Sequence, residues 1–201
     1  MNNNDLLNLL KDLSTCIVGK WVVYGGTMLG LHRDGKFLDW EKDIDIVLID
    51  DAYIDMDKLK SFDSIGFQDY YMHRKIYRKG FPVFKPKNKW TEYVSYIRML
   101  PENVGKNRAE LLKIASQTYS EQCITSHFTT CFIDVENMKL DSDEQYKSIY
   151  FPKCYFKKKE IDNIQYIEYG NMSIPLPTYL DEVCARHYGE DWHIPNKDWL
   201  Y

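Results

Sequence analysis

The spacing of apolar residues along the chain predicts an alternation of helices and short strands. Leucines recur at helical spacing near the N-terminus and predict an amphipathic helix over residues 4–19. The apolar run 21–24 ends at two adjacent glycines, which predicts a strand that enters a tight turn. Residues 27–32 then read as the start of a helix, with Thr27 near its cap, and residues 44–49 as a second strand.

The same reasoning extends to the rest of the chain. A short helix and loop are expected over residues 58–66, a helix over 108–118, and strands over residues 67–77, 93–99 and 128–136. Residues 164–174 predict a hairpin that turns at Gly170-Asn171, followed by a helix over 176–188 that Pro177 opens and Gly189 stops. No repeat, low-complexity tract or linker interrupts this order. We expect one domain over residues 1–201, of the α/β or α+β class, with a mixed central β-sheet flanked by helices.

Composition and charge exclude several classes of protein. The chain has 201 residues, 44% of them hydrophobic, which is enough for a core and too many for a disordered chain. A net charge of -4 gives no electrostatic case for nucleic-acid binding. Eight acidic residues and one lysine lie between Asp39 and Asp57, whereas eleven Lys or Arg and three Glu lie between His73 and Ala115. This asymmetry fits either two solvated faces or an anion-handling segment near an acidic metal site.

The expected cellular setting is cytoplasmic. The five cysteines form no CxxC pair and are odd in number, which argues against a zinc site or a disulfide framework. The N-terminal segment MNNNDLLNLLKDL is amphipathic and acidic, unlike a signal peptide. No apolar run approaches the length of a membrane span.

Asp43 and Asp45 are the first candidates for chemistry. They lie two residues apart at the start of the second predicted strand, so their carboxylates share one face while Ile44 and Ile46 face the opposite side. Two unit charges about 6.6 Å apart repel by roughly 2–3 kcal/mol at an effective dielectric near 20. A hydrated strand end would tolerate that repulsion, and a cation held between the two carboxylates would turn it into attraction.

The surroundings of this pair favour the cation. Gly25, Gly26 and Thr27 form a turn between a strand and a helix start, where backbone N–H groups can approach a phosphate. Asp134, on a later strand, is the candidate third carboxylate, with Glu136 on the same face as the reserve. Hard oxygen ligands imply Mg²⁺ or Mn²⁺, and carboxylates beside a phosphate-binding turn suit phosphoryl or nucleotidyl transfer.

These residues resemble a known family. A strand, a Gly-Gly-Thr turn, a D-x-D strand and a later single acid form the pattern of the nucleotidyltransferase (polymerase β-like) fold. The stretch YGGTMLGLHRDGKFLDWEKDIDI is similar to the signature of the LicD/fukutin-related family, and IPLPTYLDEVCARHYGEDWHIP is similar to that family's closing segment. With Asp134 between the two, the resemblance touches about residues 21–195.

The resemblance implies a metal-dependent phosphotransferase with a nucleotidyltransferase-like fold. Its donor would be a CDP-linked alcohol, and it would move phosphocholine, ribitol phosphate or a similar group to a glycan hydroxyl, releasing CMP. Carried over by position, Asp43, Asp45 and Asp134 would be the catalytic metal ligands. Gly25, Gly26, Thr27 and Arg33 would bind the phosphate side, Arg33 through a bidentate contact. Gly35 and Trp40 match as architecture.

Some features depart from the family pattern or stay open. Many relatives have Asp where this chain has Glu41 and Lys42, and Lys42 is either a surface lysine, which we favour, or a contact to donor phosphate. The basic segment 74–90 reads as a loop or loose hairpin that is either solvated or closes over an anionic ligand. His32 is expected to be a capping or solvent-facing residue.

Two other functions compete with this assignment. A nucleotidyltransferase of the same fold would move NMP from an NTP to a small molecule. A catalytically silent member would bind a nucleotide or glycan without turnover, although a binding protein has no need of paired carboxylates.

Overall fold

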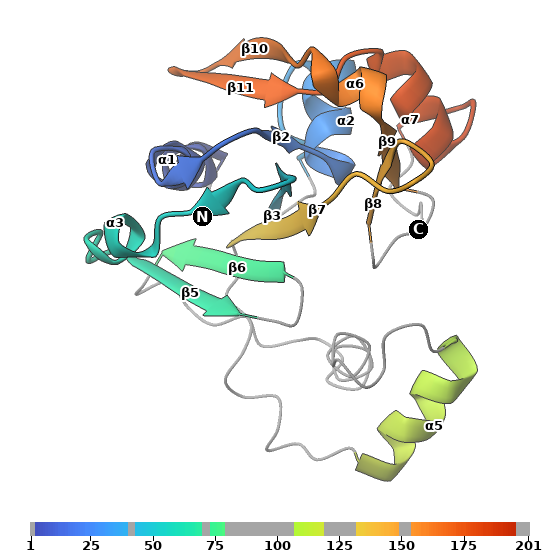
Figure 1. The fold of residues 1–201 in the computed structure, drawn as a ribbon, viewed down its shortest axis with the longest axis horizontal. Coiled ribbons are helices and arrows are strands. Elements are labelled where there is room, and N and C mark those ends of the chain that lie inside the picture. Colours follow the sequence, from blue (N-terminus) through green and yellow to red (C-terminus); the bar gives the residue numbers. More distant parts are fainter. Residues whose placement is uncertain are drawn as a thin grey trace.

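A computed structural model of the chain describes residues 3–39, 43–69, 73–78, 107–118, 132–148 and 154–195 (Figure 1). In chain order the elements are α1 (Asn3–Ser14), β1 (Ile17–Val18), β2 (Trp21–Val23), α2 (Gly25–Asp34), β3 (Asp43–Ile49), β4 (Tyr53–Ile54), α3 (Met56–Lys60), β5 (Ile65–Asp69), β6 (His73–Arg78), α5 (Arg108–Thr118), β7 (Phe132–Met138), β8 (Gln145–Lys147), β9 (Tyr155–Lys157), α6 (Lys158–Asp162), β10 (Gln165–Tyr169), β11 (Met172–Leu176) and α7 (Leu180–Tyr188).

The centre of the fold is a five-stranded sheet with the order β2-β3-β7-β6-β5. Strands β3 and β7 are parallel, and every other neighbouring pair in this sheet is antiparallel. The predicted mixed sheet flanked by helices is therefore confirmed, and the class is α+β. The parallel pair lies in the middle of the sheet, where long-range pairing joins residues about 90 positions apart in the sequence.

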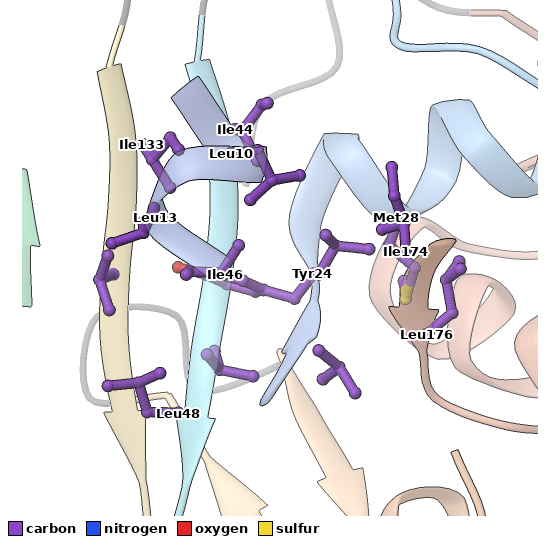
Figure 2. Close-up of a cluster of buried hydrophobic side chains, with 14 of the residues drawn as sticks. Leu10, Leu13, Tyr24, Met28, Ile44, Ile46, Leu48, Ile133, Ile174 and Leu176 are labelled. Carbon is purple, nitrogen blue, oxygen red and sulfur yellow. The ribbon is translucent and has the colours of Figure 1, made fainter. Parts of the chain in front are cut away.

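One face of the sheet is covered by α1 (Figure 2). Leu10 and Leu13 of this helix are fully buried and belong to the same core as Ile44 and Ile46 of β3 and Ile133 of β7. Alternation along β3 sends the isoleucines to the α1 face and Asp43 and Asp45 to the other face, as the sequence predicted. Burial of the apolar face is what fixes this register, because a slip of one residue would bury the carboxylates instead.

Several predicted boundaries are wrong. The first helix ends at Ser14 and not at residue 19, because Cys16 N–H closes a turn onto the Leu13 carbonyl and Ile17-Val18 pair with β4. The second helix begins at Gly25 itself, without a separate turn, and its first helical hydrogen bond runs from Met28 N–H to the Tyr24 carbonyl.

The middle of the chain shows similar shifts. The helix expected over 58–66 is α3, which begins at Met56 because the Asp55 side chain caps it. The strand expected over 67–77 is two antiparallel strands, β5 and β6. The predicted helix over 108–118 is confirmed as α5. The strand expected over 93–99, and residues 128–131 of another, lie outside the described residues.

The C-terminal third of the described chain packs against the start of the sheet. The predicted hairpin is confirmed as β10 and β11, with Gly170 in the left-handed region at its turn. The last helix begins at Leu180 and not at residue 176, because β11 continues to Leu176; it ends at Tyr188, directly before Gly189, as predicted. Ile174 and Leu176 of β11 share the core with Met28 of α2 (Figure 2).

Within the part of the chain that the structure describes, no helix combines the length and the apolar character needed to cross a bilayer.

Candidate metal centre

Three carboxylates gather on the sheet face opposite α1. Asp43 and Asp45 come from β3, and Asp134 comes from β7, where it is the direct register partner of Asp45. Residues directly opposite each other in neighbouring strands point to the same face, so the pairing brings Asp134 to the β3 pair. All three are half-buried, and one ligand atom from each lies within 4.8 Å of the other two.

The start of α2 lies directly against this cluster. Tyr24 N–H donates to the Asp45 carbonyl at 3.1 Å, and Asp45 N–H donates to the Thr27 hydroxyl at 3.0 Å. Gly25 has φ 60°, and a Cβ at this position would lie 2.8 Å from Oδ2 of Asp45. A side chain is thus excluded at Gly25 by both backbone conformation and space. Two hydrogen bonds to the backbone of Asp45 and one close approach therefore fix the Gly-Gly-Thr segment relative to Asp45.

A second set of polar groups lies next to the carboxylates, two residues further along the same face of β7. Glu136 is only 2% exposed, and its Oε2 accepts hydrogen bonds from the Tyr24 hydroxyl at 3.2 Å and the Ser148 hydroxyl at 3.1 Å. Burial, together with the charges of Asp45, Glu136 and Asp134, raises the pKa of Tyr24 well above its usual value of 10. Tyr24 is therefore a neutral hydroxyl donor at physiological pH, which suits a buried carboxylate partner.

Glu136 has a role that sequence reasoning placed elsewhere. The sequence offers it as the reserve third ligand, but it lies two residues further along β7 than Asp134, opposite Val47, and the geometry groups Asp134 with Asp43 and Asp45. Tyr24 was not a predicted site residue at all. The signal that points to it is its position: it is the last residue before Gly25, at the N-cap of α2.

Arg33 lies away from the carboxylates, at the C-terminal end of α2. Eight residues separate it from Gly25, which is about 12 Å along a helix axis. Its guanidinium donates two hydrogen bonds to Asp34, both 2.8 Å long, and a third of 3.4 Å to the Trp192 carbonyl. These contacts favour a role in holding the C-terminal segment, and the phosphate contact that the resemblance implied stays a prediction.

His32 takes part in the same attachment. Its Nε2 lies 2.7 Å from Oδ1 of Asp181 on α7, and its ring stacks on Trp192 with centroids 5.2 Å apart. These contacts hold the C-terminal segment, which resembles the closing segment of the family, against α2, the helix that begins at Gly25. Trp40, Glu41 and Lys42 lie outside the described residues, as do residues 79–90 of the basic segment 74–90; residues 74–78 belong to β6.

The donor set fits a hard divalent cation. Three carboxylates offer only oxygen ligands, which is the chemistry that Mg²⁺ and Mn²⁺ prefer. Two opposite ligands of one Mg²⁺ lie about 4.2 Å apart, and the three ligand atoms here lie within 4.8 Å of one another, so their spacing is compatible with one shared ion.

Comparison with known proteins bears on this geometry. A family model described as LicD/FKTN/FKRP, nucleotidyltransferase domain, matches residues 20–113. This match supports membership of the LicD family. The match includes Asp43, Asp45, the Gly25–Thr27 segment and Arg33, whereas Asp134 lies beyond its end. LicD proteins are generally transferases. A search of curated proteins found no match for the chain.

Proposed function

We propose that this LicD-family protein is a metal-dependent phosphotransferase that moves a phospho-alcohol from a CDP-linked donor to a glycan hydroxyl and releases CMP. The observation that carries the proposal is the register of Asp45 and Asp134, which gathers three carboxylates directly against the start of α2. An acidic cluster alone can be a hydrated surface. An acidic cluster joined by hydrogen bonds to a Gly-Gly-Thr helix start offers a cation site and a phosphate site side by side.

In this proposal Asp43, Asp45 and Asp134 hold Mg²⁺ or Mn²⁺. When bound, such an ion supplies positive charge to the phosphate oxygens and lowers the barrier to phosphoryl transfer. Other residues of the chain position the site. Thr27 and Tyr24 hold the backbone of Asp45 in place, and Glu136 holds Tyr24 by accepting the hydrogen bond of its hydroxyl.

The beginning of α2 is the proposed phosphate end of the site. The first N–H groups of a helix have no partner inside the helix and favour negative charge. Gly25 leaves the space above Asp45 open, because any side chain there would occupy it. Backbone N–H groups of Gly26 and Thr27 are the proposed donors to the donor's phosphate oxygens.

The proposed reaction balances as a single displacement. The acceptor hydroxyl oxygen forms a bond to the phosphorus that bears the alcohol, and the bond from that phosphorus to the CMP oxygen breaks. The hydroxyl proton passes to one of the site carboxylates and then to solvent, so that CMP leaves as the anion. Because the sequence carries no Ser-His-Asp arrangement that we can place, a carboxylate is the proposed base.

We also propose that residues 1–201 act as one domain. Val183 and Cys184 of α7 and Ile174 of β11 belong to the same hydrophobic core as β2 and β3, which supports this reading. The expected cytoplasmic location and the expected absence of nucleic-acid partners belong to the same proposal and rest on composition alone.

Product analysis tests the proposed reaction. Incubation of the protein with CDP-choline or CDP-ribitol, Mg²⁺ and a glycan acceptor is expected to release CMP without pyrophosphate. Asp45→Asn should abolish that release, and circular dichroism should show an unchanged fold. Release of pyrophosphate from an NTP would instead support the nucleotidyltransferase alternative. Mg²⁺-independent binding of the nucleotide without turnover would support a silent binding protein.

A further inference from the structure

A groove lies on the side of the sheet opposite the carboxylates, and residues of α1 and of the β10–β11 hairpin line it. Figure 1 shows these two elements next to each other. The volume of the groove is about 710 Å³, which is within the range of small-molecule sites. The floor includes Trp21 of β2, whose register partner is Leu48, so its side chain lies on the face that α1 covers. The proposed transferase site does not use any residue of this groove.

The walls of the groove carry polar groups at regular positions. On α1, Lys11 and Ser14 are three residues apart, a spacing that places side chains on one face of a helix, and Thr15 directly follows the end of α1. On the hairpin, Tyr166 and Ser173 face the same space from two antiparallel strands. At the tip of the hairpin, Gly170 lies against the Leu7 side chain of α1.

Two aromatic rings of the groove remain available to a ligand. Tyr166 is 62% exposed, although it belongs to a strand that packs on the core through its other face. Trp21 is half-buried, with part of its indole in the core and part lining the groove. Such rings offer a flat apolar surface with a polar edge, which suits the faces of sugar rings.

The charge of the groove differs from that of the whole protein. Its described lining contains Lys11 and Lys20 and neither Asp nor Glu, although the chain carries a net charge of -4. Lys20 donates to the carbonyls of Ile161 and Asp162, so its ammonium group is held at the end of α6. A fixed positive charge in a concave surface attracts anions.

We propose that this groove binds an anionic oligosaccharide. Trp21 and Tyr166 would contact the sugar rings, Ser14, Ser173 and Asn171 would meet their hydroxyls, and the two lysines would select carboxylate or phosphate substituents. The site is separate from the carboxylate cluster, so its occupation needs neither donor nor metal.

Calorimetry on the full chain tests the proposal with defined probes. A hyaluronan tetrasaccharide, which carries two carboxylates, is expected to bind in the absence of Mg²⁺ and nucleotide. Tetra-N-acetylchitotetraose, which has the same number of rings and no charge, should bind at least fivefold more weakly. Equal binding of the two sugars, or no binding of the anionic one, would overturn the proposal. Binding of a dT4 oligonucleotide as tightly as the anionic sugar would also overturn it.

Variants locate the binding in the groove. Lys11→Glu is expected to raise the Kd for the anionic tetrasaccharide by about fivefold to tenfold, since it reverses one charge at the ligand. Tyr166→Ala removes an exposed ring at little risk to the fold and should weaken both sugars. Lys113→Glu, the same charge change on α5 far from the groove in Figure 1, should leave the Kd unchanged. A loss with Lys113→Glu equal to that with Lys11→Glu would contradict a localised site.

Discussion

Gly25 and Asp45 are in contact in a way that leaves no room for a side chain on the glycine. The ideal Cβ position on Gly25 lies 2.8 Å from Oδ2 of Asp45, and the glycine has φ 60°. This contact joins the helix start to the carboxylate cluster, and it explains why a glycine stands at the first position of α2.

Gly25→Ala should therefore disable the site. The added methyl group would push the Asp45 carboxylate away from Asp134, so we expect a loss of at least tenfold in CMP release. Gly35→Ala is the matched control, because Gly35 has a similar φ of 67° and no atom within 4 Å of its Cβ position. Both variants should lose about 1–2 kcal/mol of folding free energy from the left-handed backbone. Equal activity losses in the two variants would show that strain alone, and not the contact with Asp45, is responsible.

The Tyr24 and Glu136 hydrogen bond should position the site without entering the chemistry. Tyr24→Phe leaves the buried Glu136 carboxylate with one fewer donor, which should cost about 1–3 kcal/mol of stability. We expect kcat to fall while KM for the donor stays close to its original value. Tyr166→Phe, which removes the hydroxyl of an exposed tyrosine, serves as the control. A tenfold rise in KM with unchanged stability would instead place Tyr24 in direct contact with the substrate.

Buried His187 should make stability fall in mild acid. Burial and the charge of Arg186 lower its pKa to about 4, while its Nε2 lies 3.0 Å from the Tyr155 carbonyl. Above pH 6.5 both folded and unfolded states hold a neutral imidazole, so the stability is full there. As the pH falls from 6.5 to 4, the unfolded state takes up a proton and the folded state does not. This difference lowers the free energy of unfolding by roughly 3 kcal/mol in total.

Urea unfolding at several pH values measures this effect. For the original protein, the slope of the unfolding free energy against pH between pH 6 and 4.5 should approach the value for uptake of one proton. In His187→Gln this slope should be smaller. His193→Gln, which alters an exposed histidine, should leave the slope unchanged. The same slope in His187→Gln as in the original protein would assign the acid sensitivity to other groups.

Arg33 offers a test between two roles. If Arg33 holds the C-terminal segment, Arg33→Gln should destabilise the protein by about 1–3 kcal/mol, and Trp192→Ala should do the same. In that case KM for the CDP-linked donor should change little in either variant. If Arg33 contacts phosphate, Arg33→Gln should raise KM strongly and leave the folding free energy unchanged. Parallel urea titrations and kinetics on the two variants decide between these outcomes.

The sequence contains local patterns strong enough to predict most elements and the face that Asp43 and Asp45 share. Alternation of apolar residues in β3 is a local signal, and so is the Gly-Asn turn of the last hairpin. The pairing of Asp45 with Asp134 is not local, because the register of two parallel strands is set by core packing between distant segments. The order of motifs suggested Asp134, but only the sheet shows which acid of β7 lies beside Asp45.

The features that sequence reasoning missed depend on tertiary contacts. Tyr24 reads as the end of an apolar strand, and its hydrogen bond to Glu136 crosses 112 positions of the chain. Arg33 reads as a phosphate ligand by position in its motif, whereas its contacts with Asp34 and Trp192 follow from the packing of the C-terminal segment on α2. The sequence also does not predict that α2 begins at Gly25, because glycine is a poor helix former and suggests a turn.

Direct measurement of Mn²⁺ binding tests the central claim that Asp43, Asp45 and Asp134 form a metal site. Free Mn²⁺ is measured by electron paramagnetic resonance during titration of the protein and of three variants, each with one of these aspartates changed to Asn. We predict saturable binding by the original protein, at least tenfold weaker binding in each variant, and no change in Asp51→Asn, an exposed aspartate outside the cluster. Equal Mn²⁺ affinity in the original protein and in Asp45→Asn and Asp134→Asn would contradict the account.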